Sequence, residues 1–395
     1  MEIGLVGKPN VGKSTFFNAA TEGHAQIANY PFTTIEANRG VAFVRRRCPH
    51  LDFNVQCNPR HSPCVNGTRL IPVEVLDVAG LVPDAHKGKG LGNKFLDDLR
   101  QASALIHIVD ASGSTDFEGN PLPPGTHDPL EDIKFLEDEI VYWIKGLLEK
   151  DWQRIAKQAH IQGKKLERLL AEKLAGLGIG EAQILKALKD VGDMNPMEWR
   201  EEELLRFSRR IREVSKPILI AANKADMATD EQLERLKSAE GLLVVPTCAE
   251  AELALKRASG AGLIEYTPGE DHFRVLKPES LTEVQKKALK KIEDILSRFG
   301  STGVQDAIEA AVFRLLKRIV VYPVEDEHHL TDHDGRVLPD AFLMPEGSTA
   351  KDLAYKVHTD LGEKFIRAID AREHRVIGAD HPLKDGDIIK IVAGR

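Results

Sequence analysis

The sequence predicts an α/β protein built on a doubly wound, mostly parallel β-sheet. Short apolar runs bounded by turn residues recur along the chain, as buried strands of such a sheet do. The first run, residues 2–6, leads directly into a glycine-containing loop and then into the helix-like stretch 15–21. A strand, a loop and a helix in this order are typical of α/β sheets. Further strands are expected at residues 41–44, 71–76, 104–109, 218–222 and 242–245.

Length and composition exclude several classes of protein. The 395 residues, of which 42% are hydrophobic, can fill more than one core. No stretch reaches the roughly 18 apolar residues of a membrane span, and the start of the chain carries no targeting pattern. We therefore expect a soluble, cytoplasmic protein without a membrane partner. The net charge of −7 argues against general binding of polyanions, so no DNA specificity is expected, although it does not exclude local basic patches.

The chain is expected to form several parts. About a hundred residues separate the strand near residue 109 from the one at 218, far more than one crossover needs. Interleaved charges over residues 130–214 predict an α-helical hairpin arm inserted there. Beyond residue 319, short β-branched runs and one helix predict a separate α+β domain. The expected divisions are 1–127 with 214–275 for the sheet domain, 128–213 for the arm, 276–318 for connecting helices and 319–395 for the C-terminal domain.

The loop after the first strand carries the phosphate-binding motif of a P-loop. Residues 7–14 fit the pattern G-x-x-x-x-G-K-[ST]. Its glycines let backbone N–H groups close around phosphates, Lys13 reaches the β- and γ-phosphate oxygens, and Ser14 ligates magnesium. The residues expected to contact the nucleotide here are Gly7, Asn10, Val11, Gly12, Lys13, Ser14 and Thr15.

Two further motifs follow in the order that a nucleotide site requires. Residues 77–80 read Asp-Val-Ala-Gly at the end of a strand, where Asp77 can hold the magnesium shell and the Gly80 N–H can meet a γ-phosphate. Residues 223–226 read Asn-Lys-Ala-Asp, and the Asp226 carboxylate can accept hydrogen bonds from guanine N1–H and its exocyclic amine. Adenine lacks this pair of donors, and stranding a buried carboxylate costs enough for strong discrimination. The ligands expected are therefore GTP and GDP.

These three motifs together resemble those of the TRAFAC class of GTPases, and residues 29–36 narrow the match to its Obg-related branch. This segment looks like the first switch of that branch, which implies Thr34 as a magnesium ligand, with Thr33 as the alternative. Residues 77–99, with their glycine-rich stretch, look like its second switch. Residues 247–250 resemble the guanine-contacting Ser-Ala motif, with Cys248 in place of serine and the backbone of Ala249 retained.

The layout of the whole chain is similar to that of the YchF-type subfamily of Obg-like GTPases. Residues 343–350 and 383–387 are similar to parts of a TGS domain, which has a ubiquitin-like β-grasp fold and is associated with RNA and ribosome contacts. The resemblance implies a ribosome or RNA partner, bound through the helical arm and the TGS domain. Some members replace the aspartate of the Asn-Lys-x-Asp motif by glutamate and accept ATP, but Asp226 is intact here.

A group of basic residues in the arm offers a surface for such a partner. Lys157, Lys164, Lys165 and Arg168 crowd one stretch that has few acids nearby, which favours contact with RNA. The alternative is a solvated helical hairpin that only supports the core.

Hydrolysis is expected to be slow and dependent on magnesium. Leu81 stands where Ras-type enzymes carry the glutamine that orients the attacking water, and leucine can neither donate nor accept a hydrogen bond. The resemblance implies a potassium ion near the phosphates with Asn10 as its ligand, whereas a turn-forming role beside Pro9 is the alternative. His24 and His86 are other candidates for positioning the water. The residues assigned to catalysis are Lys13, Thr34, Gly80 and Asn10.

A cysteine- and histidine-containing insertion lies between two expected strands. Residues 45–69 hold three thiols and two imidazoles, which are Cys48, His50, Cys57, His61 and Cys64. A tetrahedral zinc site of the three cysteines with His61 is one reading, although the paired C-x-x-C spacing is missing. Free cysteines, or a disulfide between Cys57 and Cys64, are the alternatives. The insertion has five arginines and one aspartate, so it is a third candidate RNA-facing surface.

The function expected from the sequence is that of a GTP-hydrolysing switch that binds the ribosome or another RNA–protein assembly. A nucleotide-dependent binding scaffold with incidental hydrolysis and an ATP-accepting YchF-like ATPase are the alternatives. A P-loop phosphotransferase would need a phosphate acceptor and would have no use for Asn223 and Asp226.

Overall fold

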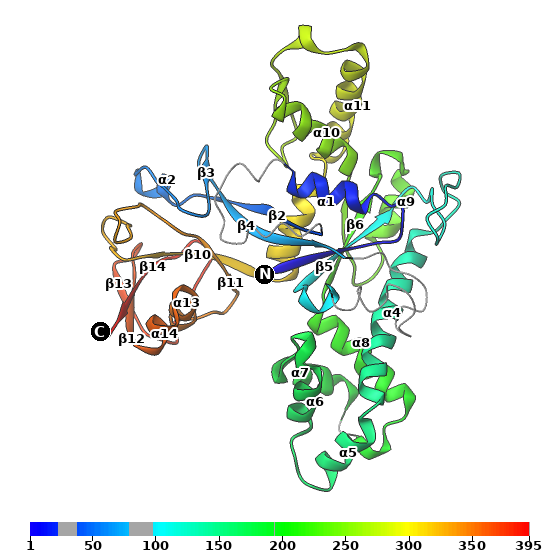
Figure 1. Cartoon of the computed structure of the whole chain (residues 1–395), viewed down its shortest axis with the longest axis vertical. Coiled ribbons are helices and arrows are strands. Elements are labelled where there is room, and N and C mark those ends of the chain that lie inside the picture. The colour runs from blue at the N-terminus through cyan, green and yellow to red at the C-terminus, as the bar shows by residue number, and fades with distance from the viewer. Residues whose placement is uncertain (23–37, 79–97, 193, 395) are drawn as a thin grey trace. The chain divides into compact units, whose positions relative to one another are not determined.

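The computed structural model describes residues 1–22, 38–78, 98–192 and 194–394 (Figure 1). The chain divides into two compact units. The first holds residues 1–20 and most of 74–307, and the second holds 41–73 and 308–394.

The larger sheet has seven strands, six of them in the order β2-β4-β1-β5-β6-β7, with β3 paired to β4. Strand β1 pairs in parallel with β4 and β5, and β6 pairs in parallel with β5 and β7, whereas β3 and β4 are antiparallel. The predicted mostly parallel α/β sheet is therefore confirmed. Its strands are β1 (Glu2–Val6), β2 (Arg39–Arg47), β3 (Cys64–Val65), β4 (Thr68–Asp77), β5 (Ala104–Asp110), β6 (Ile218–Asn223) and β7 (Leu243–Pro246).

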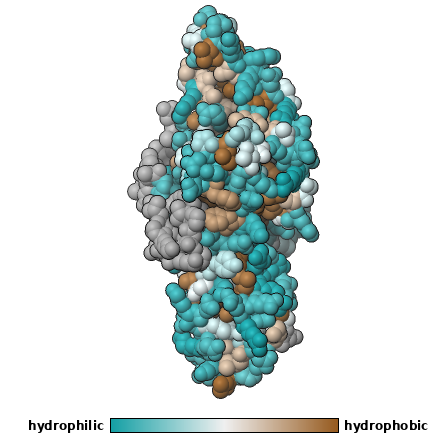
Figure 2. Space-filling view, turned by 90° about the vertical axis from the view of Figure 1, so that its right-hand side faces the viewer, coloured by the Kyte–Doolittle hydropathy of each residue, from teal (hydrophilic) through white to brown (hydrophobic). Residues whose placement is uncertain are grey.

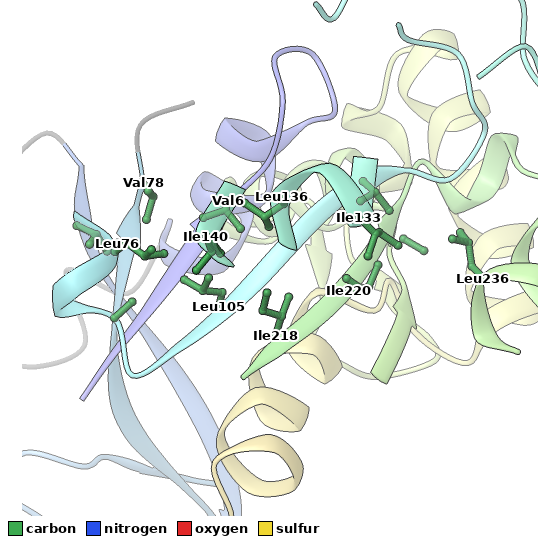
Figure 3. Close-up of a cluster of buried hydrophobic side chains, with 14 of the residues drawn as sticks. Val6, Leu76, Val78, Leu105, Ile133, Leu136, Ile140, Ile218, Ile220 and Leu236 are labelled. Carbon is green, nitrogen blue, oxygen red and sulfur yellow. The ribbon is translucent and has the colours of Figure 1, made fainter. Parts of the chain in front are cut away.

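Helix α4 (Pro129–Glu149) covers part of this sheet (Figure 3). The side chains of Ile133, Leu136 and Ile140 recur on one face of the helix and are buried with Val6 and Leu105 of the strands. Burying each such side chain contributes roughly 1.5–3 kcal/mol relative to leaving it exposed. This core fixes the strands whose carboxyl ends carry the sequence motifs.

Between β5 and β6 the described chain is mainly helical. Trp152 and Trp199 stack there with ring centroids 4.8 Å apart, and the Phe207 ring meets Trp199 edge-on at 5.5 Å. These aromatic contacts join Trp152, in the middle of the insertion, to its last helix, which contains Phe207 and leads back to the sheet. The insertion comprises α4, α5 (Trp152–His160), α6 (Leu166–Leu174), α7 (Glu181–Val191) and α8 (Glu201–Ser215).

The remaining elements of the first unit are the helix after the P-loop and the helices and short strands that follow β6. Helix α11 begins at a capping box, in which Thr282 Oγ1 accepts from the Gln285 amide at 3.2 Å, and it ends at Gly300 in the left-handed conformation. The elements are α1 (Lys13–Thr21), α9 (Asp230–Lys237), α10 (Ala249–Gly260), β8 (Ile264–Glu265), β9 (Arg274–Val275), α11 (Glu283–Phe299) and α12 (Val304–Glu309), the last of which runs into the second unit.

The C-terminal part of the second unit is an α+β domain with its own five-stranded sheet, in the order β11-β10-β14-β12-β13. Its core is formed by buried residues such as Val321, Leu353 and Ile389. The predicted separate α+β domain is confirmed. Its elements are β10 (Arg318–Val324), β11 (Phe342–Pro345), α13 (Ala350–Val357), α14 (Thr359–Glu363), β12 (Phe365–Asp370), β13 (Arg375–Ile377) and β14 (Ile388–Ala393).

Among the described residues, no helix is both long and apolar enough to cross a membrane. The face shown in Figure 2 is mostly hydrophilic, and its hydrophobic residues form small, separate patches. Scattered exposed apolar residues of this kind are normal for a folded chain.

Candidate functional site

The P-loop connects β1 to α1 and depends on two glycines. A Cβ on Gly7 would lie 2.7 Å from the Ile108 carbonyl oxygen, so no side chain fits there without a shift of the backbone. Gly12 has φ +92°, and a Cβ there would overlap the Asn223 amide group. Only glycine tolerates both conditions at position 12. The loop therefore packs closely against β5 and against the Asn-Lys-x-Asp motif.

Asn223 joins three parts of the site through one buried side chain. Its Nδ2 donates to the Val11 carbonyl of the P-loop at 2.8 Å. Its Oδ1 accepts from the Ala249 amide at 3.1 Å and from Thr247 Oγ1 at 3.3 Å. The side chain thus links the phosphate-binding loop to the loop that carries Cys248 and Ala249, and it uses the Ala249 amide to do so.

Lys224 is positioned by an acid that sequence reasoning missed. The residue has φ +57°, and its Nζ lies 2.8 Å from Asp110 Oδ2 at the end of β5. The Asp110 carboxylate also accepts from the hydroxyls of Ser112 and Ser114, at 2.6 and 2.8 Å. Burial acts to raise the pKa of Asp110, but these hydrogen bonds outweigh it, and the pKa lies below its usual value. The position of Asp110 at the end of an apolar strand is the feature of the sequence that could have indicated this role.

Asp226 lies just after Lys224 in a single 3₁₀ turn, Ala225–Met227. Its Oδ2 is 3.0 Å from Lys291 Nζ of α11. Arg298, on the same helix, donates to the carbonyls of Ala225 and Ala228 at 3.4 and 3.1 Å. The basic face of α11 therefore holds the turn that presents the carboxylate.

Cys248 and Ala249 lie beside this turn at the start of α10. The Cys248 amide donates to the Thr302 carbonyl at 2.8 Å. Burial and, to a smaller extent, the nearby Asp226 carboxylate together raise the pKa of the Cys248 thiol to about 12. The thiol is therefore a neutral, buried group that packs beside Asp226.

At the P-loop, the predicted phosphate-binding Lys13 and the predicted magnesium ligand Asp77 lie together. Lys13 Nζ forms an ion pair with the Asp77 carboxylate, which ends β4 next to β1. Ser14 is exposed at the start of α1, and Thr15 is half-buried. Magnesium prefers oxygen ligands, so the Ser14 hydroxyl and the Asp77 carboxylate are groups of the kind that hold this ion.

Asn10 and Lys8 tie the P-loop to the segment that follows β5. Asn10 has φ +62°, and its Nδ2 donates to the Gly119 carbonyl at 2.8 Å. Lys8 Nζ donates to the Thr115 carbonyl at 2.9 Å and pairs with Asp132 of α4 at 2.8 Å. Sequence reasoning gave Lys8 no role, because nothing in the motif shows which acid it meets.

Several predicted residues lie outside the described part of the chain. These are the predicted switch residues His24, Thr33, Thr34, Gly80, Leu81 and His86.

The cysteine-containing insertion corrects one predicted residue. Cys48, Cys57 and Cys64 come together, but the imidazole that lies with them is that of His50 and not that of His61, which the sequence had favoured. His50 follows Cys48 closely at the start of α2 (His50–Phe53), so its ring reaches the thiols. His61 Nδ1 instead lies 3.0 Å from Asp340 Oδ1. The alternative disulfide between Cys57 and Cys64 is absent, since all four cysteines, each of them described, are free.

The basic residues of the arm are exposed. Lys157, Lys164 and Lys165 have no acidic partner among the described residues, and Arg168 lies 3.5 Å from Glu172. On α11, by contrast, Lys286 and Lys290 pair with neighbouring acids at 2.8 and 3.4 Å. Of these two basic surfaces, the arm keeps more of its positive charge uncompensated.

Comparison with known proteins agrees with this geometry. The model of the 50S ribosome-binding GTPase family matches residues 2–141, that of the G4 motif-containing domain of YGR210-like Obg-like GTPases matches 221–326, and that of the TGS domain matches 329–393. The fold and the motif positions thus define a P-loop GTPase with a C-terminal TGS domain.

Individual relatives extend the match to the full length. A GTP-binding protein of Methanocaldococcus jannaschii is 54% identical over 99% of this chain and 98% of its own. The crystal structure of a GTP-binding protein from Pyrococcus horikoshii is 46% identical, covers both chains completely and has a TM-score of 0.81. The ribosome-binding ATPase YchF of Haemophilus ducreyi is 29% identical over 98% of each chain. The chain belongs to the YchF-type subfamily of Obg-like GTPases.

Proposed function

We propose that this protein is a magnesium-dependent GTPase that acts as a slow molecular switch on the ribosome or another RNA assembly. The observation that carries the proposal is the set of hydrogen bonds made by Asn223, which joins the P-loop to the Thr247–Ala249 segment. A site that only bound phosphates would not need this connection. The connection made by Asn223 supports a pocket in which the base and the phosphates are recognised together.

Base selection is assigned to Asp226. Its carboxylate would accept two hydrogen bonds from guanine, from N1–H and from the exocyclic amine, whereas adenine presents an acceptor at N1. The side chain is 19% exposed, so an unsatisfied carboxylate would be partly desolvated and costly. Lys291, at 3.0 Å, and the Arg298 contacts to the backbone keep the turn in place.

The phosphate groups are assigned to the P-loop. Its backbone N–H groups and the positive end of α1 favour anions, and Lys13 supplies a full charge. Ser14 and Asp77 would hold magnesium, together with Thr34, and the ion would offset negative charge on the phosphates. Gly80 would donate its N–H to the γ-phosphate. Because Asn10 Nδ2 is used by the Gly119 carbonyl, its Oδ1 remains the atom assigned to a potassium ion.

Slow turnover follows from the residue at the water-orienting position. Leu81 offers no hydrogen bond to an attacking water, so hydrolysis would depend on the remaining charges around the phosphates. An enzyme of this kind suits a timing role, in which the bound nucleotide sets the state of the switch.

The RNA-facing surface is assigned first to the helical arm and the TGS domain. Exposed lysines without acidic partners, such as Lys157, Lys164 and Lys165, can release counterions from a phosphate backbone. The name of the Haemophilus ducreyi relative, which describes a ribosome-binding protein, supports the same partner.

ATP hydrolysis is a second candidate, because that relative is named an ATPase. The intact Asp226 argues for GTP, since its carboxylate matches the donors of guanine and not those of adenine.

One experiment separates these candidates. We would measure magnesium-dependent hydrolysis of GTP and ATP in potassium and then in sodium, with and without ribosomes, for the wild type and for Asp226→Glu. Selective GTP turnover that rises with ribosomes is the expected result, and potassium dependence would support the role of Asn10. Equal use of ATP would refute guanine selection, and indifference to ribosomes would refute the partner.

A further inference from the structure

Residues 48–69, here called the cysteine segment, are built from very short elements. Helix α2 has four residues and strand β3 has two. Strands β3 and β4 are joined by Asn66 and Gly67, both with positive φ, as in a tight two-residue hairpin turn. The Cys48 amide donates to the Gly67 carbonyl at 2.8 Å and closes the segment on itself. Elements this short form little apolar core of their own.

Four metal-binding side chains converge in this segment. The sulfur atoms of Cys48, Cys57 and Cys64 and a ring nitrogen of His50 all lie within 4.8 Å of one another. The Cys48 and Cys57 sulfurs are 3.9 Å apart. His50 Nδ1 is 3.3 Å from Cys57 Sγ and 3.6 Å from Cys64 Sγ. Cys48 and Cys57 are buried, and the other two residues are half-buried.

The three individual separations match edges of a zinc tetrahedron, and the remaining pairs of ligand atoms lie within 4.8 Å. With Zn–S near 2.3 Å and Zn–N near 2.05 Å, tetrahedral angles place two sulfurs about 3.8 Å apart and a sulfur and a nitrogen about 3.6 Å apart. The observed values lie within about 0.3 Å of both figures. A disulfide would instead require sulfurs about 2.05 Å apart.

A buried cation beside the cluster adds an electrostatic argument. Arg69 lies directly opposite Cys64 in the β3–β4 pairing, and its side chain is fully buried. Its guanidinium donates to the Ser62 carbonyl at 2.9 Å and to the Leu338 carbonyl at 2.8 Å, and its Nε has no hydrogen-bond partner among the described residues. No carboxylate of the described residues pairs with it. Three thiolates, a neutral imidazole and Zn²⁺ carry a net charge of −1, which would compensate this buried guanidinium.

The cysteine segment is also fastened to a neighbouring stretch of the second unit. The amides of Asn58 and Arg60 donate to the carbonyls of Val337 and Pro339, at 3.1 and 2.8 Å. Arg60 also pairs with Asp332 at 2.8 Å. A cross-link inside the segment would therefore hold a surface on which residues 332–339 pack.

We propose that Cys48, His50, Cys57 and Cys64 bind one structural zinc ion. Three soft thiolates and one imidazole in a tetrahedron are the ligands that zinc prefers. Four protein ligands leave no open position for a substrate, so the ion would be structural and not catalytic. The ion would bind through His50 Nδ1 and would fix the cysteine segment in its folded form.

The first test is the metal content of the full-length protein, purified without added metal and analysed by mass spectrometry for metals. We expect about one zinc per chain. Cys57→Ser and His50→Ala should lose most of it, whereas the matched controls Cys248→Ser and His61→Ala should keep it. Retention of zinc by Cys57→Ser, loss of zinc by His61→Ala, or iron in place of zinc would overturn the assignment.

A second measurement does not depend on the folding of any variant. After the metal is removed from the wild type under reducing conditions, Co²⁺ is added as a spectroscopic probe. The expected spectrum shows tetrahedral d–d bands and thiolate-to-cobalt charge transfer, which saturate at about one equivalent. A folded chain that holds no zinc and gives no such spectrum, or one that contains a Cys57–Cys64 disulfide, would refute the site.

Discussion

The nucleotide edge of the sheet and the cysteine segment both hold a few polar side chains in fixed positions, but by different means. At the nucleotide edge, Asp77, Asp110 and Asn223 are the last residues of strands that share a buried core, and Lys13 begins the helix that follows the loop after β1. In the cysteine segment, the side chains that converge come from a four-residue helix, a two-residue strand and loops. The first region is rigid because of hydrophobic burial, whereas the second needs a local cross-link.

This difference predicts how each region responds to the loss of a functional side chain. Removing a group at the nucleotide edge should change binding and turnover while the sheet stays folded. Removing a metal ligand should unfold the cysteine segment and leave nucleotide binding nearly intact.

Cys57→Ser should destabilise the cysteine segment by about 4 kcal/mol, less than the binding energy of zinc in isolated finger peptides because hydrogen bonds to residues 337–339 remain. Hydrogen exchange measured by mass spectrometry should show amides of residues 48–69 exchanging about 10³-fold faster. GTP affinity should change by less than about twofold. Faster exchange that spreads along β1, β5 and β6 would show that the two regions are not independent.

Lys13→Ala should lower kcat for GTP by about 10²- to 10³-fold, since it removes a charge assigned to the developing negative charge on the phosphates. The thermal stability of the chain should change little, because the Asp77 side chain is 21% exposed and water can solvate it once the lysine is gone. Lys8→Met is the matched control from the same loop. It leaves Asp132 buried without its partner, so it should lower the free energy of unfolding while kcat changes little. The opposite pattern would reverse the roles of the two lysines.

Asn223→Ala should cost about 3 kcal/mol of unfolding free energy, about 1 kcal/mol for each of its three hydrogen bonds. GTP affinity should fall at least about tenfold, because the P-loop and the Thr247–Ala249 segment lose their connection. Denaturant unfolding and equilibrium nucleotide binding measure the two effects. Thr247→Val removes only the weakest of these bonds and should show about a third of the loss. Equal effects of the two variants would argue against the bridging role of Asn223.

Asp110→Asn should reduce stability by about 1–2 kcal/mol at neutral pH, because Lys224 loses its charged partner. The pKa of Asp110 is lowered in the folded protein, so its contribution is complete above about pH 5 and is lost as the pH falls through the folded pKa, below about 3.9. Unfolding measured from pH 7 to pH 3 should show the two proteins converging at acid pH. A constant difference across this range would contradict the assignment.

The sequence predicted the nucleotide edge well, for a physical reason. Buried strands read as short apolar runs; Asp77 and Asn223 stand at the ends of two of them, and the loop that leads to Lys13 follows directly after the first. Parallel strands bring their carboxyl ends to one edge, so order along the chain was enough to place these residues near each other.

Pairings between distant side chains could not be predicted in this way. The partners of Lys224, Lys291 and Lys8 depend on which loops and helices pack beside the strand ends. The choice between His50 and His61 depended on contacts between distant parts of the chain, because His61 meets Asp340 while His50 lies with the thiols.

The most direct test of the central claim is an exchange of base specificity at position 226. Asparagine offers one donor and one acceptor, so Asp226→Asn should match xanthine, which has an oxygen where guanine has its exocyclic amine. We would measure the affinities of wild type and variant for GTP, ATP and xanthosine triphosphate. We expect wild type to prefer GTP over ATP by at least about 100-fold, and the variant to lose affinity for GTP and gain affinity for xanthosine triphosphate by similar factors. Equal affinity of wild type for GTP and ATP, or a variant that still prefers GTP, would contradict guanine selection by Asp226.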